Sequence, residues 1–185
     1  MKDSFGLFEK IETSIEGLFE IQTKVRGDNR GSFIKTFHID AFKELNLETD
    51  FIERYHSTSV KNVLRGMHFQ TPPADHVKLV YCAEGKVLDV VVDLRKNSST
   101  FGKHQKFNLD AEKGNMIYIP KGLAHGFLTL SDKAVMFYNQ TTVYSLENDK
   151  GVLWSSCEID WNCTAPILSE RDKKHPALAD FDSPF

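Results

Sequence analysis

Short apolar segments separated by turn-forming residues dominate this 185-residue chain. The segments are rich in Val, Ile, Phe and Tyr, which favour strands over helices. We expect strands at 17–25 and 32–38, around the turn RGDNRG, and then in FIERYHSTSV, VLRGMHFQ, HVKLVYCAEG, KVLDVVVDLR, HQKFNLD, NMIYIPKG, HGFLTLS and AVMFYNQTTVYS.

Helical periodicity is scarce. Residues 39–47 (IDAFKELNL) are the best helix candidate, with Asp40 as the expected N-cap, and residues 155–185 look irregular or short-helical. Many strands with turn-sized connections favour an antiparallel sandwich or barrel over a β-α-β layout. We therefore expect a single all-β domain over residues 1–185, with a few short helices.

Composition narrows the class of protein further. A net charge of −3 and a pI near 6.2 give no basic surplus for binding nucleic acid or anionic lipid. The apolar runs are too short to cross a bilayer, and the N-terminus MKDSFGLFEK lacks the features of a signal peptide. Three cysteines with no C-x-x-C pair disfavour a disulfide scaffold or a structural zinc site. We expect a cytoplasmic protein with no nucleic-acid or membrane partner.

Two stretches carry the candidate chemistry. Gly114 to His125 has the spacing G-x5-P-x-G-x2-H, which resembles the second motif of the cupin jelly rolls. The first cupin motif is normally H-x-H followed by a glutamate, six residues and a glycine. Here it reads His68-Phe69-Gln70, then Lys78 and Gly85. Because a glutamine and a lysine replace two ligands, and an ammonium opposes a cation, we expect no metal.

A cavity with two histidines, Lys78 and the Arg65 guanidinium suits an anionic intermediate. His68 is a candidate base that removes a proton next to a carbonyl, and Lys78 then stabilises the enolate oxygen. Tyr138 is a candidate acid for the opposite face, and Asp172 could orient His68 and raise its basicity.

Each of these residues also has an ordinary structural role open to it. His68 could be a hydrogen-bonded core histidine, and His125 could pin a turn. Tyr138 could be a packing residue and Asp172 a cap. Lys78 could be a solvated lysine on an edge strand, and Arg30 and Arg65 could each form a surface ion pair.

The sequence resembles the dTDP-4-dehydrorhamnose 3,5-epimerase family from about Gly17 to about Pro176. The resemblance rests on GDNRGSF, NVLRGMHFQ, KLVYCAEGKVLDVVVDLRKNSSTFGK, IYIPKGLAHGFLTLS, MFYNQTT, GVLW and LSERD followed by HPAL. It implies a cupin-like double-stranded antiparallel jelly roll that forms a homodimer. An N-terminal strand of each subunit would reach into the site of its partner.

The resemblance also implies residue roles and a cofactor-free reaction on a nucleotide-sugar. His68 would be the base with Asp172 as its partner, Tyr138 the opposing acid, and Lys78 the enolate stabiliser. Further positions would bind the substrate: Arg30, Arg65, His125, Arg171 and Asp149, the last in place of a glutamate.

Several recognition positions depart from the family pattern. In F-G-D-x-R-G-x-F-x-E an aromatic residue has become Arg26 and an acid has become Lys35. Glu53 and Tyr55 replace Q-x-N, and Asn139 replaces the lysine after the tyrosine. We hypothesise a different nucleotide, a different 4-keto sugar, or inversion at only one carbon, with Arg26, Lys35, Glu53 and Tyr55 in contact with substrate.

Three rival functions remain at this point. They are a metal-dependent cupin oxygenase, which Gln70 and Lys78 oppose, a nucleotide-sugar 3,4-ketoisomerase, which Tyr138 and LSERD oppose, and a non-catalytic sugar-binding jelly roll.

Overall fold

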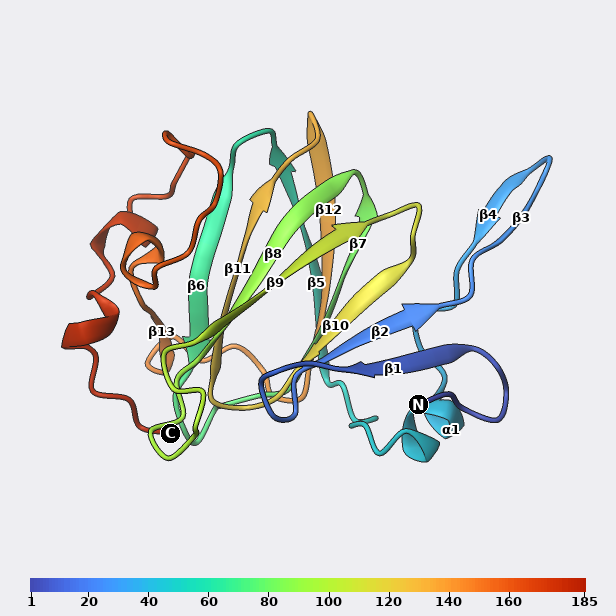
Figure 1. Cartoon of the computed structure of the whole chain (residues 1–185), viewed down its shortest axis with the longest axis horizontal. Coiled ribbons are helices and arrows are strands. Elements are labelled where there is room, and N and C mark those ends of the chain that lie inside the picture. Colours follow the sequence, from blue (N-terminus) through green and yellow to red (C-terminus); the bar gives the residue numbers. More distant parts are fainter.

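The computed structural model describes residues 1–185 and contains two large antiparallel sheets that face each other (Figure 1). The six-stranded sheet has the order β1 (Phe8–Glu12), β2 (Phe19–Thr23), β10 (Asn115–Ile119), β7 (Lys78–Glu84), β12 (Lys133–Gln140) and β5 (Glu53–Val60). The five-stranded sheet has the order β13 (Asp149–Gly151), β6 (Leu64–Gln70), β11 (Leu123–Thr129), β8 (Lys86–Asp93) and β9 (His104–Asp110). The expected all-β jelly roll is confirmed.

The main core fills the space between the two sheets. Both sheets contribute fully buried residues to it, among them Val80, Val91, Ile117, Phe127 and Met136. Two residues of this core, Phe127 and Tyr138, also line the cavity described below, so the core forms part of the wall of that cavity.

The outer face of each sheet is also covered. Helix α1 (Ile39–Glu44) packs Phe42 against the six-stranded sheet beside Phe8 and Ile21. The C-terminal segment packs Trp161 against Met67 and other residues of the five-stranded sheet. Strands β8 and β11 are therefore buried on both faces, which explains why they read as continuous apolar runs rather than as an alternation.

A small hairpin projects from the body of the molecule (Figure 1). It consists of β3 (Arg26–Asp28) and β4 (Gly31–Phe33), and all six residues are exposed. The expected strand at 32–38 is wrong beyond Phe33, because the chain leaves the hairpin there and continues without strand pairing to α1.

The N-cap expected for the helix needs correction. The N-cap of α1 is His38, whose ring accepts a hydrogen bond from the Ala41 N–H, and Asp40 lies inside the helix. The sequence does not predict strands β1, β3 and β13, and β3 lies in the stretch RGDNRG that was expected to be a turn. The C-terminal segment contains short 3-10 turns η1 (Trp154–Ser156), η2 (Asp172–Lys174) and η3 (Leu178–Asp180), as the irregular pattern suggests. No helix has the length and apolar character needed to cross a membrane.

Candidate active site

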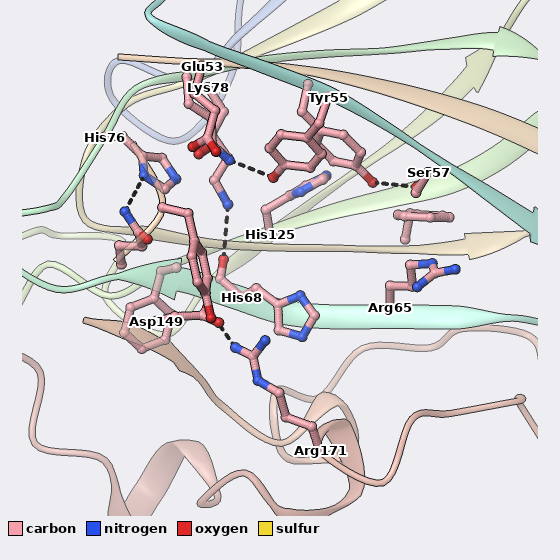
Figure 2. Close-up of a pocket in the computed structure, with 16 residues that line it drawn as sticks. Glu53, Tyr55, Ser57, Arg65, His68, His76, Lys78, His125, Asp149 and Arg171 are labelled. Carbon is pink, nitrogen blue, oxygen red and sulfur yellow. Dashed lines mark hydrogen bonds and ion pairs between the residues drawn. The ribbon is translucent and has the colours of Figure 1, made fainter. Parts of the chain in front are cut away.

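The barrel opens at one end into a cavity of about 410 Å³ between the two sheets (Figure 2). Nine of the residues singled out in the sequence line it: Glu53, Tyr55, Arg65, His68, Lys78, His125, Tyr138, Asp149 and Arg171. They come from both sheets and from the C-terminal segment, so the fold gathers residues that are more than a hundred positions apart.

His68 lies on β6 and is held by a carboxylate from outside the barrel. Its Nε2 is 2.7 Å from Oδ1 of Asp172, on turn η2. An ionised carboxylate only accepts hydrogen bonds, so Nε2 carries the proton and Nδ1 keeps a lone pair. Burial lowers the pKa of His68, and it prevails over the opposing effect of Asp172. The ring is therefore neutral near pH 7 and able to accept a proton.

The Asp172 carboxylate is almost completely buried. Its Oδ2 lies 3.5 Å from the Gly66 backbone N–H, and the Asp172 N–H donates to Ser169 Oγ at 3.0 Å. Burial alone would raise the pKa of Asp172, but the hydrogen bond from His68 and the nearby His175 ring, 3.7 Å away, outweigh it and hold the pKa well below its usual value. Asp172 is thus ionised throughout the physiological range.

His125 forms a second histidine–aspartate pair beside the first one. Its Nε2 is 2.8 Å from Oδ2 of Asp89, which lies on β8, and both residues are fully buried. Burial raises the pKa of Asp89, despite the nearby His125 and Lys78. This pair lies in the wall of the cavity, with the His125 ring packed edge-on against Tyr138.

Lys78 extends from β7 across the cavity towards the opposite sheet (Figure 2). Its Nζ is 3.5 Å from the His68 carbonyl oxygen and makes no salt bridge. Burial lowers the pKa of Lys78 to about 8, although the negative charges of Asp149 and Asp89 oppose this shift. The ammonium therefore remains available for a negative charge that develops on a bound ligand.

Tyr138, on β12, faces His68 from the other sheet. Its hydroxyl lies 3.3 Å from Ser57 Oγ, and burial raises the pKa of the phenol well above its usual value. Tyr55 stacks on it with ring centroids 4.7 Å apart, and Gln140 donates to the Tyr55 hydroxyl at 2.7 Å. A neutral phenol and a neutral imidazole thus approach the cavity from opposite sheets.

The two acidic residues that line the cavity differ in their partners: Asp149 forms an ion pair, whereas Glu53 does not. Asp149 accepts a 2.6 Å hydrogen bond from Arg171 Nη2, which neutralises both groups. Oε2 of Glu53 is buried without a hydrogen-bond partner. The cavity therefore presents one unpartnered carboxylate, at a position where the family pattern has glutamine.

Three expected substrate-binding residues lie outside this cavity. Arg26 and Arg30 belong to the projecting hairpin, where Arg30 pairs with Asp28 at 2.5 Å. Lys35 follows the hairpin and does not line the cavity either. The structure does not bring these residues to the site of their own chain.

Other lining residues escaped the sequence reasoning. Ser57, His76, Gln140 and Tyr144 all line the cavity. His76 is neutral, since burial and the Lys78 charge lower its pKa to about 3. The register of β5 against β12 places Ser57 and Gln140 on the cavity face of the sheet. That register cannot be obtained from one sequence, so these two residues could not be predicted to line the cavity.

One group of three residues has the composition of a metal site: His68, Asp172 and His175, whose ligand atoms lie within 4.8 Å of one another. The 2.7 Å separation of His68 Nε2 and Asp172 Oδ1 is that of a hydrogen bond. Two ligands on a tetrahedral zinc at about 2.0 Å would be roughly 3.3 Å apart. The residues at the two cupin motifs fit a metal no better, because His125 is engaged by Asp89 and Lys78 is a cation.

A base, a cation and an acid that line one cavity from two opposing sheets can transfer protons next to a carbonyl group, and the fold is a jelly roll of the cupin type. The family model described as dTDP-4-dehydrorhamnose 3,5-epimerase matches residues 12–180. The chain belongs to the dTDP-4-dehydrorhamnose 3,5-epimerase family.

Individual members of the family are similar to this protein over nearly its whole length. The dTDP-4-dehydrorhamnose 3,5-epimerase of Shigella flexneri is 42% identical over 175 residues, 93% of this chain and 97% of that protein. A dTDP-4-dehydrorhamnose 3-epimerase of Streptomyces niveus is 37% identical over 169 residues, 90% of this chain and 82% of that protein. The dTDP-6-deoxy-D-glucose-3,5-epimerase of Legionella pneumophila, solved with dTDP-4-keto-L-rhamnose, superposes with a TM-score of 0.90 at 35% identity, covering 95% of each chain.

Proposed function

We propose that this protein epimerises a nucleotide-activated 4-keto-6-deoxy sugar at C3, C5 or both, without a cofactor, in deoxysugar biosynthesis. The observation that carries the proposal is the 2.7 Å contact between His68 Nε2 and Asp172 Oδ1, which leaves Nδ1 of a neutral ring free as a base. The names of the relatives, which include both 3,5- and 3-epimerases, support the same reaction class.

The proposed reaction has two proton transfers. His68 Nδ1 removes the proton from the carbon next to the C4 ketone, and the electron pair moves onto the ketone oxygen as an enolate. The Lys78 ammonium stabilises that oxygen. Tyr138 then donates its proton to the opposite face of the carbon, so the electron pair returns from the oxygen and the centre is inverted.

Opposite-sheet placement is what makes inversion feasible. His68 belongs to the five-stranded sheet and Tyr138 to the six-stranded one, so a sugar ring between them meets a base on one face and an acid on the other. The Tyr138 hydroxyl can be reprotonated through Ser57, whose Oγ is 3.3 Å away. A buried phenol with a raised pKa keeps its proton until the carbanion forms.

Substrate binding is assigned to the remaining cationic and polar residues. We propose that Arg65, His125, Asp149 and Arg171 bind the nucleotide-sugar within the chain, beside Glu53 and Tyr55. Arg26, Arg30 and Lys35 would complete the site of a partner subunit in a homodimer, which explains a fully exposed hairpin that carries Phe33 at 61% exposure. The three free cysteines fit a cytoplasmic setting.

The test follows deuterium from solvent into the sugar. The protein is incubated in D2O with the 4-keto-6-deoxyglucose derivative of dTDP, and NMR records deuterium and configuration at C3 and C5. Exchange with inversion at one or both carbons is the expected result. Rapid exchange at both carbons with ordinary affinity would exclude the altered-substrate hypothesis raised by Glu53 and Tyr55. Absence of exchange with the dTDP, GDP, CDP and UDP derivatives would exclude the epimerase.

A further inference from the structure

A second histidine packs against the His68–Asp172 pair from outside the cavity. Nε2 of His175 lies 3.7 Å from Oδ1 of Asp172, the same oxygen that binds His68. The two imidazole rings meet edge to face, with centroids 5.7 Å apart and an interplanar angle of 72°. The His175 side chain is 11% exposed, and its Nε2 is buried with no hydrogen-bond partner, so the Asp172 carboxylate at 3.7 Å is an acceptor that a small movement would bring within reach.

The backbone fixes His175 in this place. Turn η2 brings Asp172 and His175 onto one side, since they are three residues apart. The Leu153 N–H donates to the Pro176 carbonyl at 2.7 Å, which ties this segment to the end of β13. A Cβ on Gly151 would lie 2.5 Å from His175 Nε2, so the absence of a side chain at that position makes room for the ring.

The carboxylate needs such support because it controls the state of His68. Asp172 keeps the His68 proton on Nε2 only while Oδ1 points at that atom. On the other side Asp172 receives only the long 3.5 Å contact from Gly66. A donor directed at Oδ1 from His175 would prevent rotation of the carboxylate and keep an acceptor of fixed geometry behind the base.

We propose that His175 is a positioning residue of the active site, which holds Asp172 through its Nε2–H and thereby maintains the tautomer of His68 that acts as base. This inference rests on the proposed function, in which His68 Nδ1 takes the substrate proton. His175 does not line the cavity, so its effect reaches the substrate only through Asp172 and His68.

Three variants separate positioning from packing. His175→Leu removes the donor and keeps an apolar side chain, His175→Gln restores a donor at a similar reach, and Gly151→Ala pushes an intact His175 away from its place. The exposed His56 on β5 gives the matched control His56→Leu. For each variant, kcat and KM of the epimerase are measured, and ¹⁵N NMR reports the tautomer of His68 in the full-length protein.

We expect His175→Leu to lower kcat by about tenfold to a hundredfold, the loss that small misplacements of catalytic groups produce. KM should stay within about a factor of two, since no substrate contact is removed. The His68 signal should shift towards a mixture of tautomers, and Gly151→Ala should do the same. His175→Gln should recover most of kcat, and His56→Leu should change neither quantity.

A packing role would give a different result. If His175→Leu lowers the melting temperature while kcat and the His68 tautomer stay as in the unmodified protein, the proposal is wrong. It is also wrong if Gly151→Ala leaves the tautomer unchanged. If the unmodified protein catalyses no exchange, the proposed function fails, whereas the NMR comparison still decides whether His175 controls His68.

Discussion

Two histidine–aspartate pairs lie side by side on paired strands of the same sheet, yet they differ in environment. His68 and His125 are direct partners across β6 and β11, and their hydrogen bonds to aspartate are 2.7 and 2.8 Å long. The His68 side chain is 29% exposed, whereas that of His125 is 5% exposed. Bond length alone therefore does not distinguish a base from a residue that fixes the wall of the cavity.

The carboxylates of Asp172 and Asp89 distinguish the two pairs more clearly than the bond lengths do. Asp172 has donors or polar neighbours on both oxygens, and these interactions hold its pKa low. Asp89 has one buried oxygen without a partner, and burial raises its pKa. The first pair can accept a proton on His68 and stabilise the resulting charge. In the second pair His125 is the hydrogen-bond partner of a buried acid, so we expect this pair to stabilise the fold in addition to the substrate binding proposed for His125.

The largest expected effect is on kcat and comes from substitution of Asp172. Asp172→Asn replaces an acceptor by an amide that can donate to the imidazole, which would place the His68 proton on the wrong nitrogen. We expect kcat to fall roughly ten-thousandfold, as wrong tautomers do in other histidine–aspartate pairs, with KM little changed. Steady-state kinetics measures this, and the exposed Asp132→Asn is the control. A loss of kcat below about tenfold would show that Asp172 does not orient the base.

Substitution in the buried His125–Asp89 pair should lower the stability of the fold. His125→Asn removes the imidazole that hydrogen-bonds the buried Asp89 at 2.8 Å, and we expect the free energy of unfolding to fall by about 3 kcal/mol. Urea denaturation at neutral pH measures the change. His56→Asn, on the exposed outer face of β5, should cost less than about 0.5 kcal/mol. A comparable cost for both substitutions would remove the structural role assigned to the His125–Asp89 pair.

The pH profile should reflect the groups that face the substrate. His68 must be neutral to act as base, and its lowered pKa keeps it so to below pH 6.5. Lys78 must be charged to stabilise an enolate, and its pKa of about 8 predicts that kcat falls about tenfold per unit above that pH. Lys78→Arg, which stays charged, should lose the alkaline limb. An unmodified protein with constant kcat up to about pH 10 would contradict this role for Lys78.

Much of the fold follows from local sequence, whereas the details of the site follow from distant contacts. Runs such as KVLDVVVDLR predict strands because β-branched residues fit a sheet. The short strand β13 has no apolar pattern and forms only because β6 provides a partner. His38 caps α1 in place of Asp40 because its ring reaches the Ala41 N–H, a choice that residue preferences alone do not predict.

The same limit applies within the cavity. Resemblance to a family singled out His68, Lys78 and Tyr138, and the fold brings them to one cavity. Neither resemblance nor spacing indicated that Asp89 pairs with His125 or that His175 faces Asp172. Those contacts depend on strand register and on the path of the C-terminal segment, and neither is encoded by a local pattern.

Comparison of His68→Asn with His125→Asn decides whether His68, and not its neighbour His125, is the base. Both variants are incubated in D2O with saturating substrate at a temperature at which both are folded, and deuterium entry into the sugar is followed by NMR. We predict that His68→Asn exchanges at least roughly a thousandfold more slowly than the unmodified protein, while His125→Asn keeps more than about a tenth of its rate. Equal losses in the two variants, or a larger loss in His125→Asn, would show that His68 is not the base.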